Sequence, residues 1–106
     1  MATQDGKIRR SRKVREWQRR LGLEEWDVVC QRVSSWQVTN AMRQRTRPNE
    51  MVGVIPERER RFATIVHTRR LREDDIVHEL YHVKYPRLPE AGVRLLTWWR
   101  LRGAGG

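Results

Sequence analysis

Cysteine is nearly missing from this sequence of 106 residues, which contains only Cys30. A single cysteine excludes an internal disulfide framework, and it also excludes a zinc site made of cysteines alone. Because two valines precede Cys30, we expect its side chain to be buried and to pack as a small apolar group. Cysteine chemistry is therefore not expected to carry the function.

Long apolar runs are missing as well. No stretch approaches the roughly 18 consecutive apolar residues of a membrane-spanning helix, and no apolar segment of a signal peptide follows the basic N-terminus. We therefore expect a cytoplasmic protein that does not enter a membrane. The length predicts one domain over residues 1–106, with frayed ends at 1–10 and 103–106.

Lysine is scarce, because twenty of the 23 basic residues are arginine. Against 13 acidic residues they give a formal net charge of +10. A surface of this kind attracts nucleic acid or other polyanions. An arginine-rich composition can equally decorate an ordinary solvated surface, because net charge describes association rather than fold. Both interpretations stay open at this point.

Helical periodicity is clearest near the N-terminus. Ser11 is a suitable N-cap and Gly22 a suitable C-terminal stop. Between them Val14, Trp17 and Leu21 recur at helical spacing, and the opposite face is basic. The segment predicts an amphipathic helix whose apolar stripe packs into the core.

A second helical part follows from about Arg72. Three acidic residues at 73–75 favour a helix start there, and Pro86 ends that helix. A further helix is expected from Glu90 to about Leu101, with Pro89 at its first position. Its apolar stripe is expected to contain Val93, Leu95 or Leu96, and Trp99, and we expect Trp98 and Trp99 to lie in the core.

The middle of the chain predicts strands. Residues 26–33, 51–55 and 62–67 are rich in β-branched or aromatic side chains, and 36–38 suggests a weaker extended stretch. Pro56 is expected to break the second strand before a solvated turn at 57–60, and the strands on either side of this turn form a hairpin. Residues 43–50 are expected to be a loop. The order predicts an α+β domain: a helix, a small twisted sheet of three or four strands, and two helices.

One motif indicates metal binding and catalysis. Residues 78–82 read His-Glu-Leu-Tyr-His, an H-E-x-x-H pattern on the predicted helix. Side chains four apart lie on one helix face, about 5–6 Å apart at Cβ, so His78 and His82 can hold one Zn²⁺. Glu79 projects beside the metal, where it can act as general base toward a water molecule that zinc has made more acidic.

A catalytic zinc ion normally has three protein ligands and a water molecule. Glu90 is the first candidate for the third ligand, because it begins the last helix and two prolines force the chain to turn before it. His67, at the end of the preceding strand, is the second candidate. Its other interpretation is a residue that faces solvent. Asp75 either orients a ligand imidazole or only favours the helix start.

Three segments carry a family resemblance: 21–28 (Leu-Gly-Leu-Glu-Glu-Trp-Asp-Val), 63–67 (Ala-Thr-Ile-Val-His) and 77–82, which contains the motif. Together they resemble the minigluzincins and related SprT-like zincin metallopeptidase domains, over nearly the whole chain from Ser11 to Leu101. The resemblance implies a minimal zincin fold with an active-site helix and a C-terminal glutamate helix that carries Glu90 as the third ligand. It also implies that an extended peptide lies along strand 62–67 by strand addition.

These observations predict a zinc-dependent endopeptidase with His78, His82 and Glu90 as metal ligands and Glu79 as general base. Two alternatives remain. The first is a zincin domain that associates with DNA or RNA through the basic face of its N-terminal helix and through other arginines, namely Arg43, Arg45, Arg47, Arg69, Arg70 and Arg72. The second is a latent or non-catalytic zinc-binding domain.

Overall fold

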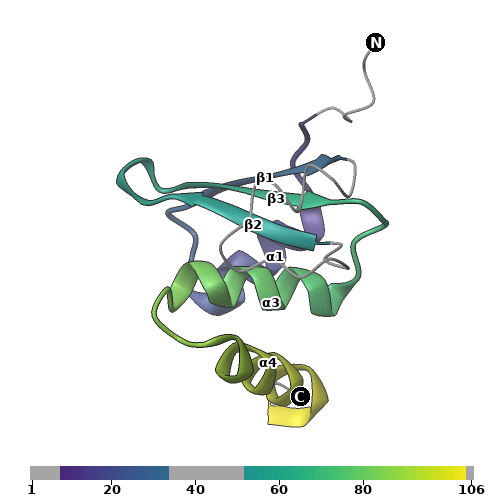
Figure 1. Cartoon of the computed structure of the whole chain (residues 1–106), viewed down its shortest axis with the longest axis vertical. Helices are drawn as coiled ribbons and strands as arrows, with labels where there is room; N and C mark the ends of the chain where they lie inside the picture. Colours follow the sequence, from purple (N-terminus) through teal and green to yellow (C-terminus); the bar gives the residue numbers. More distant parts are fainter. Residues whose placement is uncertain (1–7, 34–51, 105–106) are drawn as a thin grey trace.

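A computed structural model describes residues 8–33 and 52–104 of the chain (Figure 1). It confirms the α+β class. The elements in chain order are α1 (Arg12–Leu21), β1 (Asp27–Arg32), β2 (Val52–Glu57), β3 (Phe62–His67), α3 (Glu73–Lys84) and α4 (Glu90–Trp99). A short 3-10 helix spans Arg58–Arg60, and a π-helical turn at Arg100–Ala104 continues α4. The weak extended stretch at 36–38 and the loop at 43–50 lie outside the described residues.

The three strands form one mixed sheet in the order β1-β3-β2. β1 pairs with β3 in parallel, and β2 pairs with β3 in antiparallel, which confirms the hairpin. The expected break at Pro56 is wrong, because β2 continues to Glu57 and Pro56 pairs with Ala63. An edge strand tolerates proline when its missing N–H need not reach the neighbouring strand.

The central position of β3 corrects one expectation. β1 and β2 occupy both sides of β3, so strand 62–67 has no free edge to which a peptide could add. Among the described residues the outer positions of the sheet belong to β1 and β2. β1 also pairs with the residues before α1, where Arg9 and Cys30 exchange two backbone hydrogen bonds of 2.9 and 2.7 Å. The expectation that residues 1–10 are frayed is therefore wrong at Arg9, whose backbone pairs with β1.

Helix α1 has the boundaries that the sequence predicts. The Ser11 hydroxyl accepts a hydrogen bond from the Val14 N–H at 3.3 Å, and Gly22 ends the helix in the left-handed region at φ 75°. The expected stripe is buried, and Cys30 is fully buried beside it in the same core. Desolvation raises the pKa of the Cys30 thiol, as expected for a packing residue.

Helices α1 and α3 lie against one face of the sheet, and α4 packs on the side of α3 that faces away from it (Figure 1). Trp17 Nε1 of α1 donates to Glu73 Oε2 of α3 at 2.7 Å. Arg58 donates to the carbonyls of Val83 and His82 at 2.9 and 3.3 Å. These contacts fix both ends of α3, including the end that carries His82.

Helix α4 has a narrower buried face than its sequence suggests. Val93 is fully buried in the core and Thr97 is nearly so. Trp98 and Trp99 are 55% and 59% exposed, so the expectation that they lie in the core is wrong, and so is the inclusion of Trp99 in the stripe. The reason is that α4 packs mainly on one helix, α3, which covers only part of its surface. α4 begins at Glu90 as expected, whereas Pro89 is its N-cap and not its first helical residue.

Candidate metal centre

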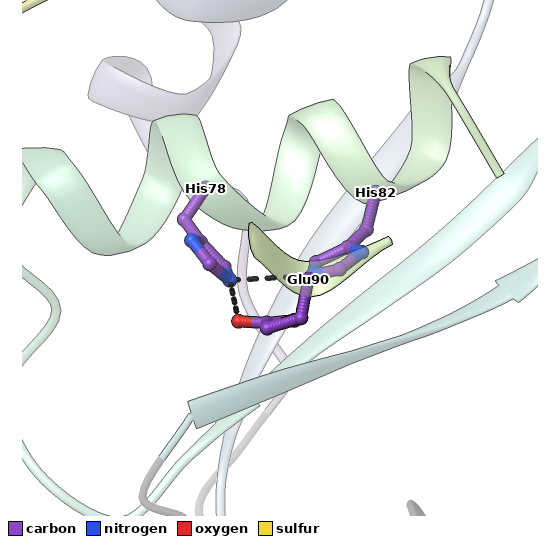
Figure 2. A group of neighbouring side chains, drawn as sticks. All are labelled: His78, His82 and Glu90. Atoms are coloured by element: carbon purple, nitrogen blue, oxygen red, sulfur yellow. Dashed lines mark hydrogen bonds and ion pairs between the residues drawn. The ribbon is translucent and has the colours of Figure 1, made fainter. Parts of the chain in front are cut away.

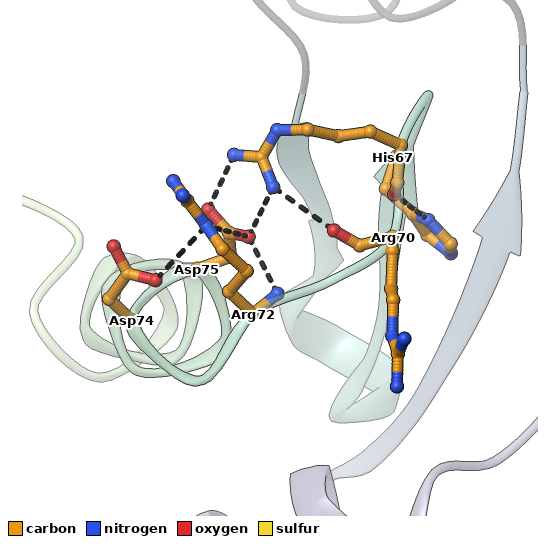
Figure 3. A network of polar contacts seen from close by, with 6 residues as sticks. His67, Arg70, Arg72, Asp74 and Asp75 are labelled. Atoms are coloured by element: carbon orange, nitrogen blue, oxygen red, sulfur yellow. Dashed lines mark hydrogen bonds and ion pairs between the residues drawn. The ribbon is translucent and has the colours of Figure 1, made fainter.

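The first turn of α3 is held by Asp75. Its carboxylate accepts the Arg72 backbone N–H at 2.8 Å and a bidentate pair of hydrogen bonds from Arg69 at 2.7 and 2.9 Å (Figure 3). Burial alone would raise the pKa of Asp75, but these hydrogen bonds and the charges of both arginines outweigh it and lower that pKa. Of the two interpretations of Asp75, its contacts are those of a residue that stabilises the helix start.

One turn further on, His78 and His82 project from the same face of α3 (Figure 2). Their Nε2 atoms are 3.2 Å apart, and their rings are inclined by 70°. The His78 side chain is 20% exposed to solvent, and the His82 side chain is 7% exposed. The spacing of four residues therefore brings two imidazole nitrogens to one point at the edge of the core, as the motif predicts.

Glu90 completes a cluster of three donors (Figure 2). Its carboxylate oxygens lie 2.8 Å from His78 Nε2 and 2.9 Å from His82 Nε2. Burial would raise the pKa of Glu90, but the charges of the two histidines, the hydrogen bond with His82 and the charge of Arg94 together lower it. The carboxylate is therefore ionised at neutral pH, as a metal ligand must be.

The turn between α3 and α4 makes this approach possible. The Tyr85 N–H donates to the Tyr81 carbonyl at 2.8 Å, and the Leu88 N–H donates to the Tyr85 carbonyl at 3.0 Å. Leu88 then folds over the first turn of α4, where a Cβ on Gly92 would lie only 2.9 Å from Leu88 Cγ. This short connection reverses the direction of the chain, so that Glu90 lies beside the two histidines of α3.

The donor set fits a zinc ion. Two imidazole nitrogens bound at about 2.0–2.1 Å in tetrahedral geometry lie about 3.3 Å from each other, close to the separation of 3.2 Å between His78 and His82. Two neutral imidazoles and one carboxylate are a ligand set that zinc uses in catalytic sites, with one position left open. His78, His82 and Glu90 therefore form a candidate metal centre.

Glu79 follows His78 and lines the same cleft, with only 5% of its surface exposed. It is not one of the three clustered donors among the described residues. The site therefore contains two carboxylates in different positions: Glu90 approaches the two imidazoles, and Glu79 lines the cleft.

His67 does not join the cluster. It is 2% exposed, so the interpretation that it faces solvent is wrong. Its Nδ1 lies 2.7 Å from the Arg69 carbonyl, and its Nε2 lies 3.3 Å from the Arg9 guanidinium. Both ring nitrogens are therefore in contact with groups outside the metal centre. Burial lowers the pKa of His67, and the hydrogen bond to Arg69 opposes this only in part.

An open cleft of about 660 Å³ leads to the cluster. α3 contributes His78 and Glu79 to it, and α4 contributes Glu90. Four arginines also line it, namely Arg69, Arg72, Arg94 and Arg102. The proximity of Arg94 to Glu90, at 3.5 Å between Nε and Oε2, was missed at the sequence level, although an acid and a base four residues apart on a helix would have indicated it.

Comparison of the chain with family models, with curated proteins and with solved structures found no match. The resemblance to small zincin domains therefore stays an expectation, and the function has to be argued from the site itself. In the described part of the chain, no helix has the length and apolar character needed to cross a membrane.

Proposed function

We propose that this chain is a zinc-dependent metallopeptidase. The observation that carries the proposal is the convergence of His78 Nε2, His82 Nε2 and the Glu90 carboxylate at one point, with Glu79 lining the same cleft. The minigluzincin-like H-E-x-x-H pattern supports the same interpretation.

His78, His82 and Glu90 would hold the metal, and the fourth position would face the cleft. When bound, zinc supplies Lewis acidity toward a carbonyl group and toward water. The chain itself keeps the two imidazoles in fixed orientations, because His82 is nearly buried and Arg58 binds the carbonyls at the end of its helix. A fixed donor geometry of this kind favours one coordination geometry over others.

Glu79 would move the proton. Glu79 lines the cleft, and in the proposed reaction its carboxylate takes a proton from the attacking water and returns it to the nitrogen of the leaving amine. General acid–base catalysis by such a group typically contributes about 10²–10⁴-fold to the rate.

The substrate would be a peptide in extended conformation. Because β3 is central, we place this peptide along β2, which is an outer strand of the described sheet and whose first residue, Val52, lines the cleft. Backbone hydrogen bonds to an outer strand provide affinity that depends little on sequence. The peptide would then cross the cleft in front of Glu79.

The decisive experiment combines metal analysis with one substitution. The purified chain should contain one zinc ion per molecule and cleave an unfolded protein such as casein. Glu79→Gln should retain the zinc ion and lose activity at least about 100-fold. Glu59→Gln is the matched control, because Glu59 is an exposed residue of the 3-10 helix and should leave both properties unchanged. A Glu79→Gln variant as active as the parent would refute the mechanism.

A second candidate function has its own observation. The exposed face of α1 carries a row of cations: Arg12, Lys13, Arg15, Arg19 and Arg20. Such a face would bind nucleic acid with an affinity that falls steeply as salt increases. Negligible affinity for DNA and RNA at low salt would dismiss this function without affecting the peptidase. Zinc binding without turnover of any protein would instead indicate a latent or non-catalytic domain.

A further inference from the structure

The four arginines of the cleft differ in how their charges are balanced. Arg69 makes two hydrogen bonds to Asp75, at 2.7 and 2.9 Å. Arg72 lies 3.6 Å from Asp74 and 3.8 Å from Asp75. This pair, on the side of the cleft near the start of α3, is therefore neutralised by carboxylates of the protein (Figure 3).

On the α4 side, two arginines have only one carboxylate between them within ion-pair distance in the described part of the chain, that of Glu90. Arg94 has one carboxylate nearby, that of Glu90, at 3.5 Å, and both histidines approach the same carboxylate. A metal ion held by Glu90 would compete for that charge. Arg102 has no carboxylate within ion-pair distance among the described residues, and its guanidinium lies over the Trp98 ring at 5.1 Å from the centroid.

These residues share one wall. Glu90, Arg94 and Trp98 follow one another at intervals of four residues along α4, and all of them line the cleft together with Arg102. Arg94 is 57% exposed at its side chain, and Trp98 is 55% exposed. The wall therefore presents two guanidinium groups and an aromatic ring to the cleft, beside the metal centre.

We propose that Arg94 and Arg102, on either side of Trp98, bind a carboxylate of the substrate, so that the cleft selects peptides with a carboxylate near the cleaved bond. The inference deepens the proposed peptidase function and rests on it. Guanidinium groups are well suited to this task, because their N–H donors match the two oxygens of a carboxylate. The Trp98 ring would cover the apolar part of a bound Glu or Asp side chain.

The carboxylate has two possible sources, the side chain of Glu or Asp and the C-terminus of the peptide. The test uses short fluorescein-labelled peptides in which a single glutamate, or a matched glutamine, stands at each position in turn. Each peptide is made with a free and with an amidated C-terminus. Binding to the full-length zinc-loaded and zinc-free protein is followed by fluorescence polarisation, which does not depend on cleavage.

We expect the best glutamate peptide to bind about fivefold more tightly than its glutamine counterpart, the effect of one partly exposed ion pair. Arg94→Gln and Arg102→Gln should each reduce this preference, and the double variant should abolish it. The control Arg60→Gln removes the same charge from the 3-10 helix outside the cleft and should preserve the preference. Raising the salt concentration from about 0.05 to 0.5 M should weaken it.

Equal binding of glutamate and glutamine peptides with either C-terminus, or no binding of any, would overturn the inference. A preference that survives in the double variant would overturn it as well. If only the free C-terminus matters, the bound carboxylate is that of the chain end. A protein that binds acidic peptides selectively but cleaves none refutes the proposed peptidase and leaves the binding wall supported. A protein that cleaves peptides without regard to their acidity supports the proposed peptidase and overturns the inference about the arginine wall.

Discussion

The Nε2 atoms of His78 and His82 lie 3.2 Å apart although their rings are inclined by 70°. One Nε2–H can donate to the other Nε2 at this distance only when the second nitrogen carries no proton. When both nitrogens carry a proton, a shared partner has to lie in front of them. Glu90 is that partner in the structure. The same arrangement leaves both nitrogens directed at a point that a divalent ion can occupy, which makes the identity of the third ligand the first question to test.

Glu90 and His67 compete for this role, and the structure predicts how they differ. Glu90→Gln should weaken zinc affinity at least about tenfold, because losing a ligand charge should cost no less than losing a residue that only orients a ligand. His67→Asn should leave the affinity unchanged, since both nitrogens of His67 contact other groups. Competition with a chromophoric zinc chelator measures both variants. Zinc loss in His67→Asn together with retention in Glu90→Gln would reverse the assignment.

Asp75 should stabilise the fold in a pH-dependent way. Its pKa is lowered in the folded chain, so its stabilising effect is present above the unfolded value of about 3.9 and is lost as the pH falls through the folded value. Asp75→Asn should lower the free energy of unfolding at pH 7 by about 1–2 kcal/mol. Urea denaturation measures this, and the neighbouring Asp74→Asn is the control, because Asp74 is 54% exposed at its side chain. Equal losses in both variants would contradict the role of Asp75.

His67 should also lower the stability of the fold as the pH falls, but nearer to neutrality than Asp75. Burial and the charges of Arg9 and Arg32 lower its pKa, while the Arg69 carbonyl and Asp75 act in the other direction. The unfolded chain therefore binds the proton more readily, and stability should fall as the pH drops below about 6.5. His67→Gln, which has no proton to gain, should lose less stability between pH 7.5 and 5.0. Parallel urea curves for parent and variant across this range would show that His67 is not responsible.

Arg58 should stabilise the end of α3 despite its exposed position. It donates to the carbonyls of Val83 and His82, groups that the helix leaves without internal partners. Arg58→Ala should cost roughly 1 kcal/mol in the free energy of unfolding. The control Arg60→Ala should cost less, because Arg60 pairs with the exposed Glu57 and lies over the Phe62 ring but donates to no helix carbonyl in the described residues. Thermal denaturation compares the two, and a greater loss in the Arg60 variant would contradict this role.

Much of the fold could be predicted because its signals are local. Ser11 and Gly22 set the ends of α1 by their own backbone and side-chain chemistry, and the spacing of His78 and His82 follows from one helical turn. The order of the strands is not local. Whether 62–67 is central or at an edge depends on which strands pair with it, and no pattern within the strand itself distinguishes the two positions.

The same reason explains the errors about single residues. His67 is buried partly because Arg9, 58 positions away in sequence, approaches its ring. Trp98 and Trp99 satisfy a helical pattern of apolar residues, but their exposure is decided by how much of α4 other elements cover. Glu90 could be proposed from the two prolines before it, whereas its distance to the histidines depends on the packing of Leu88 against Gly92.

The three donors of the candidate metal centre all lie within residues 78–90, on two helices joined by one short turn. An ion bound there would link α4 directly to α3, without any ligand from the sheet. Chelation should therefore loosen the C-terminal helix first, visible as faster amide exchange in α4 while the β3 amides stay protected. If the proposed function holds, loss of the metal ion would therefore also displace the α4 residues Arg94 and Trp98 relative to α3, and it would impair peptide selection together with hydrolysis.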